Sequence, residues 1–166
     1  LERVVHLDIN GGEPSASKNY KRILQNLPPK LKSLRLNTNC SLVIEELEDI
    51  AASGVDVTVT ASLDGIGDVH DYVRWPIKWD KFYSNLMIYK DMNIKLNTWT
   101  TVSALNIRDF KNIIKFVKQN KLDHSYAFLE KPDVLSVKYR NKFTSACAGQ
   151  FDLVATERNN DLELDI

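Results

Sequence analysis

Short strand-like runs in this chain alternate with helix-like patterns, and this order limits the folds that are open to it. The runs span residues 4–9, 33–39, 55–63, 95–102 and 125–130. Between them, apolar residues recur at helical spacing, as in Tyr20, Ile23, Leu24 and Leu27. Strands separated by helices indicate βαβ units and a parallel sheet. We therefore predict an α/β fold with about five parallel strands alternating with helices.

Polar and apolar residues also alternate within each strand-like run. In the second run, Leu34 and Leu36 face one way while Arg35 and Asn37 face the other. Parallel strands that are covered on both faces are apolar on both, so the polar face must meet water or a ligand. This favours an open half-barrel over a closed barrel filled with Val, Ile and Leu. An antiparallel α+β sheet with one solvated face would alternate in the same way, but helices between all the strands disfavour it.

Composition and charge limit the functions that this fold could serve. The 166 residues carry 22 Lys and Arg against 22 Asp and Glu, and 43% are hydrophobic. A balanced charge argues against a nucleic-acid-binding face, which needs a basic surface. The sequence holds neither an apolar run long enough to span a membrane nor a secretory signal, so we expect a cytoplasmic protein.

The pattern of alternating elements weakens towards the end of the chain. We assign residues 1–132 to the partial barrel and residues 133–166 to a C-terminal extension of the same domain or a partly disordered tail. Residues 161–166 alternate in polarity and could add an edge strand.

The metal-ligating side chains of the chain are few and scattered. Two cysteines, Cys40 and Cys147, cannot supply the ligands of an iron–sulfur cluster. The histidines His6, His70 and His124 form no ligand motif. We therefore predict no metal site in this chain.

In parallel α/β folds, ligands gather at the carboxyl ends of the strands, and the loop after the first run is distinctive. It reads Asn10-Gly11-Gly12-Glu13-Pro14. Glycines let the backbone approach a ligand closely, and Pro14 lacks an N–H donor. The loop thus presents carbonyl and carboxylate acceptors, which suit an ammonium group. It disfavours a doubly wound nucleotide-binding enzyme, whose glycine-rich loop offers N–H donors to phosphate.

Further polar side chains follow the next two runs. Asn39 ends the second run, and Ser62 and Asp64 end the third. Arg74 comes soon after, with a forked guanidinium that suits a ligand carboxylate. An ion pair with the nearby Asp71 is the alternative role for this arginine.

Taken in order, these segments resemble the radical S-adenosylmethionine (SAM) enzymes. The segments that carry the likeness are residues 11–14, 38–39, 62–65 and 70–74. Residues 79–85 and 100–107 are similar to the branch with SPASM or twitch auxiliary domains, and the twitch-type members are the most similar. The likeness spans residues 4–130 and implies a partial (βα) barrel of the radical SAM type.

The resemblance also implies a role for each residue that it matches. The loop that holds the methionyl ammonium of SAM would be Gly11, Gly12, Glu13 and Pro14. Asn39 would face the cofactor or the substrate.

Other matched residues would contact the rest of the cofactor. Ser62 and Asp64 would contact its ribose or carboxylate, and Arg74 would bind a carboxylate or order the loop. Val102 and Leu105 would lie against adenine. The resemblance assigns no catalytic residue to this fragment.

One departure from the family is large, because this chain lacks the C-x-x-x-C-x-x-C loop that ligates the [4Fe–4S] cluster. The sequence begins at a position that matches the second strand of the family, so we expect the first barrel strand to be missing and the cluster loop to lie upstream of Leu1. This fragment alone should therefore bind no cluster and be inactive.

For the parent protein, the resemblance implies an enzyme that binds SAM and a [4Fe–4S] cluster. It would generate a 5′-deoxyadenosyl radical to modify a substrate, and the SPASM and twitch branch points to a ribosomally made peptide. The alternative is a non-catalytic half-barrel that binds a peptide or metabolite. The exposed sheet edge could also pair with a second copy of the chain.

Overall fold

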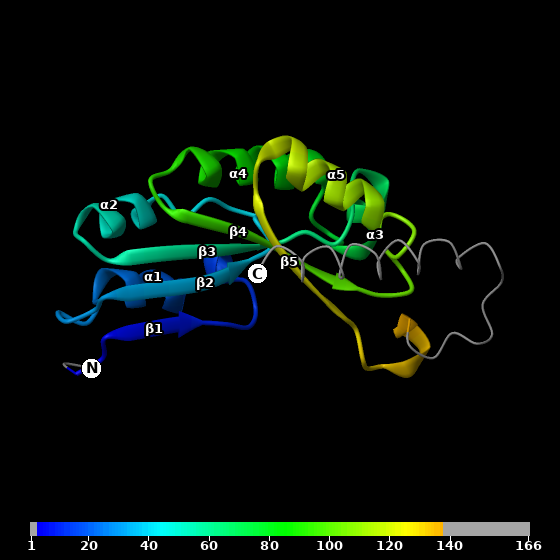
Figure 1. Cartoon of the computed structure of the whole chain (residues 1–166). Helices are drawn as coiled ribbons and strands as arrows, with labels where there is room; N and C mark the ends of the chain where they lie inside the picture. Colours follow the sequence, from blue (N-terminus) through cyan, green and yellow to red (C-terminus); the bar gives the residue numbers. More distant parts are fainter. Residues whose placement is uncertain (1–2, 138–166) are drawn as a thin grey trace, which may run out of the picture.

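The computed structural model describes residues 3–137, and these form one parallel sheet with helices between its strands (Figure 1). The strand order is the chain order, and every neighbouring pair is parallel. The strands are β1 (His6–Ile9), β2 (Ser33–Thr38), β3 (Asp56–Ser62), β4 (Lys95–Val102) and β5 (Asp123–Phe128). This confirms the predicted half-barrel architecture and excludes the antiparallel alternative.

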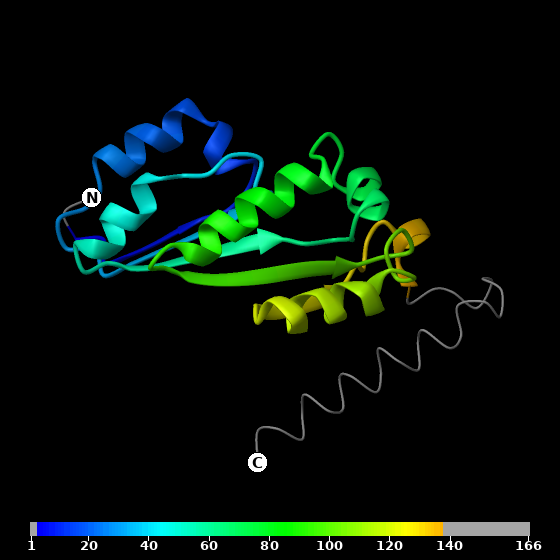
Figure 2. The same cartoon turned by 90° about the horizontal axis from the view of Figure 1, so that it is seen from above.

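Each connection between neighbouring strands contains at least one helix. They are α1 (Lys18–Gln25), α2 (Glu46–Ala52), α3 (Asp68–Val73), α4 (Trp79–Asp91) and α5 (Phe110–Asn120). Two short 3₁₀ turns, η1 (Pro14–Ala16) and η2 (Asp133–Leu135), follow β1 and β5. Figure 2 shows α1, α2 and α4 on the same side of the sheet.

The alternation within the strands sets which face of the sheet is buried. Leu34 and Leu36 in β2 are at most 1% exposed, whereas Arg35 and Asn37 between them are exposed. The register places Leu36 beside Val59, so the apolar positions form continuous rows under the helices. Burying one such side chain contributes roughly 1.5–3 kcal/mol. The polar rows are left on the opposite, concave face.

Three local features differ from the sequence prediction or go beyond it. The helix α3 was not predicted, and α5 begins at Phe110 after its N-cap Asp109, so Asn106 does not cap it. The Asn106 carboxamide instead accepts a hydrogen bond from Ser103 N at 2.8 Å and donates to Thr101 O at 3.0 Å. It therefore stabilises a turn between β4 and the helix. The strand proposed for residues 161–166 and Cys147 lie outside the described residues.

The start of the C-terminal extension packs against the barrel. Ala104 N donates to Leu135 O at 2.8 Å, and Val137 is 3% exposed. Within residues 3–137, no helix is long and apolar enough to cross a membrane.

Candidate functional site

The Glu13 carboxylate joins the loop after β1 to the end of β2. Its Oε1 accepts from Ser15 N at 3.1 Å and from Thr38 Oγ1 at 2.8 Å, and its Oε2 accepts from Asn39 N at 2.6 Å. The Ser15 hydroxyl also donates to Oε1. Hydrogen bonds to an ionised carboxylate are among the strong ones in proteins, so these contacts fix the carboxylate at the rim of the sheet.

The two glycines before Glu13 leave the backbone beside that carboxylate open. Gly11 has φ +92° and Gly12 has φ +62°, backbone conformations that favour glycine. A Cβ built on either residue would meet no atom within 4 Å. The backbone of the loop is therefore accessible, and a ligand could approach it from the concave side.

The turn after β3 is organised around the Asp64 carboxylate, which is 5% exposed. Its Oδ1 accepts from Thr101 N of β4 at 2.7 Å, and its Oδ2 lies 2.6 Å from the Arg74 guanidinium. Asp64 therefore positions Arg74, and the alternative pairing with Asp71 is wrong. Asp71 instead pairs with Lys78 at 2.8 Å and accepts from Trp79 N, and these bonds lower the pKa of Asp71.

Gly65 lets α3 pack closely onto this turn. A Cβ at Gly65 would lie 2.7 Å from the backbone nitrogen of His70, so a side chain there would displace the helix. Arg74 follows directly after α3. The Nε of its guanidinium has no hydrogen-bond partner among the described residues. A buried donor without a partner is a site that a ligand oxygen can satisfy.

The His70 ring is fully buried and packs against two aromatic rings. It lies 4.4 Å from the Phe82 ring and 5.5 Å from the Trp79 ring, measured between centroids. Burial, with a smaller contribution from the Arg74 charge, lowers the pKa of His70 to about 4. The imidazole is therefore neutral at pH 7 and acts as part of the core that supports Arg74.

This shift predicts a pH-dependent stability. The unfolded chain protonates His70 near pH 6.5, so between pH 6.5 and 4 it binds a proton that the folded state excludes. The free energy of unfolding should fall by about 3 kcal/mol as the pH drops through this window. Urea unfolding of the wild type and of His70→Phe at several pH values isolates this contribution. Equal pH dependence in the two proteins would contradict the assignment.

The loop around Glu13 and the turn around Asp64 lie at the same rim of the sheet, where the strands end. Thr38, which donates to Glu13, pairs in register with Ala61, the residue before Ser62. Neighbouring strands are roughly 4.8 Å apart, so the Glu13 loop and the Ser62 turn open side by side. The fold thus brings together Gly11, Gly12, Glu13, Asn39, Ser62, Asp64 and Arg74 at the carboxyl ends of β1, β2 and β3. Pro14 opens η1 behind them and is buried.

The two positions expected near adenine lie in different surroundings. Val102 is fully buried on the helix side of β4, and its carbonyl accepts from Leu129 N at 2.8 Å. Its side chain does not line the concave face. Leu105 is 43% exposed in the following turn, so this residue is the one free to contact a ligand.

Sequence reasoning did not single out a hollow of about 380 Å³ on the concave face. The side chains that line it are Asn37, Thr60, Ser62, Asn97 and Trp99. The register pairs Ser62 with Trp99 and Thr60 with Asn97, so these side chains share one face. The strict alternation in β4 was the sequence signal for this hollow. The alternation placed Trp99, which is 37% exposed, on the polar face.

The described residues do not fit an iron–sulfur cluster. Between residues 3 and 137 no three His, Cys, Asp or Glu side chains come together as metal ligands. Cys40 is buried behind Thr38, and burial strongly raises the pKa of its thiol. A cluster needs several thiolates, and the described residues supply only that of Cys40.

Comparison with known proteins decides the family. The sequence matches the family described as the Radical SAM superfamily over residues 2–117. The chain belongs to this superfamily. No curated protein sequence matches it significantly.

Solved structures show the same radical SAM fold. Native anSMEcpe with bound AdoMet and a Kp18Cys peptide is 20% identical, with a TM-score of 0.62 over 76% of this chain and 38% of that chain. Streptococcus suis SuiB is 18% identical, with a TM-score of 0.65 over 95% of this chain and 37% of that chain. SuiB bound to the precursor peptide SuiA is 18% identical, with a TM-score of 0.62 over 95% of this chain and 36% of that chain. The chain thus spans less than two fifths of these structures.

Proposed function

We propose that this chain forms the SAM-binding side of a radical SAM enzyme of the SPASM or twitch branch that modifies a peptide. The observation that carries the proposal is the fixed Glu13 carboxylate at the strand rim. Among the described residues, only Asn39 N donates to Glu13 Oε2. This oxygen can therefore accept a further hydrogen bond from the methionyl ammonium of SAM. The open backbone of Gly11 and Gly12 leaves space for that group.

The other end of the cofactor has partners in the same rim. Ser62 is half-buried at the end of β3 and can bond a ribose hydroxyl. Arg74, held by Asp64, offers its unpartnered Nε to a carboxylate. Asn39 lies between these residues and Glu13, and Leu105 provides an apolar contact for adenine. Bound SAM supplies radical hydrogen abstraction in this family, whereas the residues of this chain hold and orient it.

The concave hollow supports a peptide substrate. Amides and hydroxyls line it, none of its lining side chains is ionised, and the Trp99 indole adds a flat apolar surface. Such a lining can bond the amide groups of an extended peptide while the indole packs on a side chain. The peptides named with anSMEcpe and SuiB are consistent with this substrate class.

We therefore predict that Trp99→Ala raises the KM for the peptide about tenfold, because a central aromatic contact is lost. Trp99→Phe should retain most of the affinity. The affinity for SAM should stay unchanged in both variants. Steady-state kinetics of peptide modification by the full-length enzyme tests this, and an unchanged KM in Trp99→Ala would contradict it.

An exposed apolar surface beside β1 favours a further contact at the sheet edge. Leu7, Ile23 and Pro28 line a cavity of about 560 Å³ there, and Ile23 is 43% exposed. We propose that another strand and helix cover this edge, either from the barrel of the parent protein or from a second copy. Size-exclusion chromatography of this chain distinguishes a monomer from a self-associated form.

A non-catalytic half-barrel is the second candidate, because the described residues supply no cluster ligands. Anaerobic reconstitution of the full-length protein with iron and sulfide separates the two. An enzyme should become brown and release 5′-deoxyadenosine from SAM when it is reduced. A colourless protein that still binds peptide would favour the binding module.

A further inference from the structure

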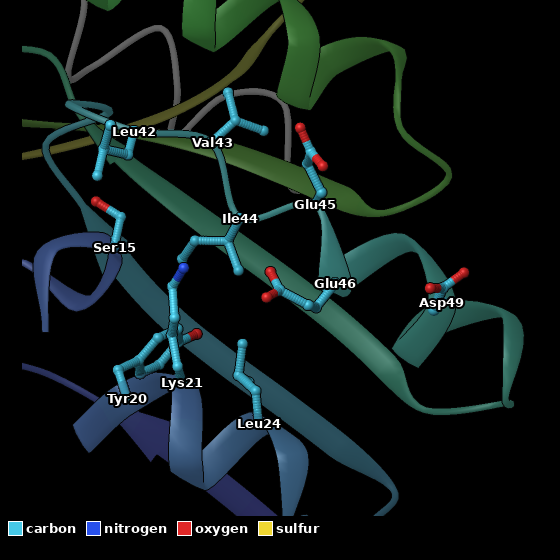
Figure 3. A pocket seen from close by; sticks show the side chains of 10 residues that line it. All are labelled: Ser15, Tyr20, Lys21, Leu24, Leu42, Val43, Ile44, Glu45, Glu46 and Asp49. Atoms are coloured by element: carbon cyan, nitrogen blue, oxygen red, sulfur yellow. The ribbon is translucent and has the colours of Figure 1, made fainter. Parts of the chain in front are cut away.

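A groove lies between α1 and the segment that leads into α2, and it is separate from the hollow on the concave face. Its volume is about 530 Å³, and residues of η1, α1 and the 42–49 segment line it (Figure 3). Ligand pockets typically have volumes of roughly 300–1,000 Å³. None of the SAM contacts proposed above lines this groove.

The hydroxyl of Tyr20 has no partner in this groove. Tyr20 is 3% exposed, and its hydroxyl bonds to none of the described residues. Figure 3 shows the hydroxyl pointing from α1 toward Ile44 and Glu46. Buried polar groups are almost always hydrogen-bonded, so this hydroxyl indicates a partner other than residues 3–137.

The groove also carries an excess of negative charge. Three carboxylates line the groove, those of Glu45, Glu46 and Asp49. Lys21 is the one cationic residue in the described part of the lining. No ion pair within residues 3–137 neutralises these carboxylates. Figure 3 shows the Glu46 carboxylate turned toward the middle of the groove. Burial and the charges of Glu13 and Glu46 raise the pKa of Tyr20, so its phenol stays protonated.

The floor of the groove is apolar. Leu24 and Ile44 are buried beneath it, and Leu42 at its upper end is 49% exposed. An apolar floor beside a carboxylate suits a side chain that has a methylene stem and a cationic head.

We propose that this groove binds an arginine side chain of a peptide partner. The guanidinium donates to the Glu46 carboxylate and to the Tyr20 oxygen, and the methylene stem packs on Leu24 and Ile44. Arginine fits better than lysine because its planar fork directs donors to two acceptors at once. The site lies outside the concave face and does not depend on the proposed function.

The test uses nuclear magnetic resonance of the full-length protein with two small probes. N-acetyl-arginine methylamide should give saturable shifts of the backbone amides in residues 15–24 and 42–49. N-acetyl-citrulline methylamide has nearly the same shape without the charge and should give none. Equal responses to the two probes, or no saturable shift with arginine, would overturn the proposal. Equally tight binding of N-acetyl-lysine methylamide would overturn the arginine assignment.

Variants of the groove distinguish a built site from a merely acidic surface. Glu46→Gln should weaken arginine binding about tenfold, and Tyr20→Phe about threefold. Tyr20→Phe removes only a hydroxyl without a partner, so its unfolding temperature should not fall. Glu48→Gln on α2 lies outside the lining and should bind as the wild type does. Wild-type affinity in Glu46→Gln would refute the site.

Discussion

Glu13→Ala in the full-length protein is expected to lower the affinity for SAM at least about tenfold and to destabilise the fold by about 3 kcal/mol. The carboxylate accepts bonds from Ser15, Thr38 and Asn39, and its loss leaves these donors unpaired at the junction of β1 and β2. Equilibrium dialysis with SAM and urea unfolding measure the two effects.

A second variant separates binding from stability. Glu13→Gln retains one acceptor oxygen and the side-chain volume, so it should cost less stability while still losing the attraction for an ammonium group. Glu48→Ala is the control, because it removes an exposed carboxylate from α2. SAM binding by Glu13→Gln that equals the wild type would contradict the assigned role.

Asp64→Ala is expected to destabilise the protein by about 3 kcal/mol, because it leaves the Arg74 charge without its partner. It also removes the acceptor for Thr101 N, which joins the turn after β3 to β4. Arg74 should then lose its fixed position, and SAM affinity should fall. Urea unfolding and equilibrium dialysis measure these effects.

An exposed ion pair provides the matched control. Asp56 Oδ2 and Lys95 Nζ lie 2.8 Å apart, but their side chains are 50% and 69% exposed. Asp56→Ala should therefore cost less than about 1 kcal/mol, as is usual for surface pairs. Similar losses in the two variants would contradict the structural role of Asp64.

The sheet could be predicted from the sequence because strand alternation directly reports which face is buried. Leu34, Leu36, Val57 and Val59 lie under the helices as this rule requires. The helix α3 could not be predicted in the same way. It is six residues long with no apolar stripe, and the burial of His70 against Trp79 and Phe82 holds it in place.

The site could be predicted only in part. Loop chemistry singled out Glu13 as an acceptor, but its bonds to Thr38 and Asn39 depend on the register of two strands. The partner of Arg74 was ambiguous for a similar reason. Asp71 is nearby in sequence, but Lys78 and Trp79 occupy it, and the fold brings Asp64 to the guanidinium instead.

The most direct test of this account is a crystal structure of the full-length protein with bound SAM. We expect the methionyl nitrogen to lie within hydrogen-bond distance of Glu13 Oε2 and the ribose to lie beside Ser62 at the same rim. SAM bound elsewhere, or a methionyl group that contacts neither Glu13 nor the backbone of Gly11 and Gly12, would contradict it.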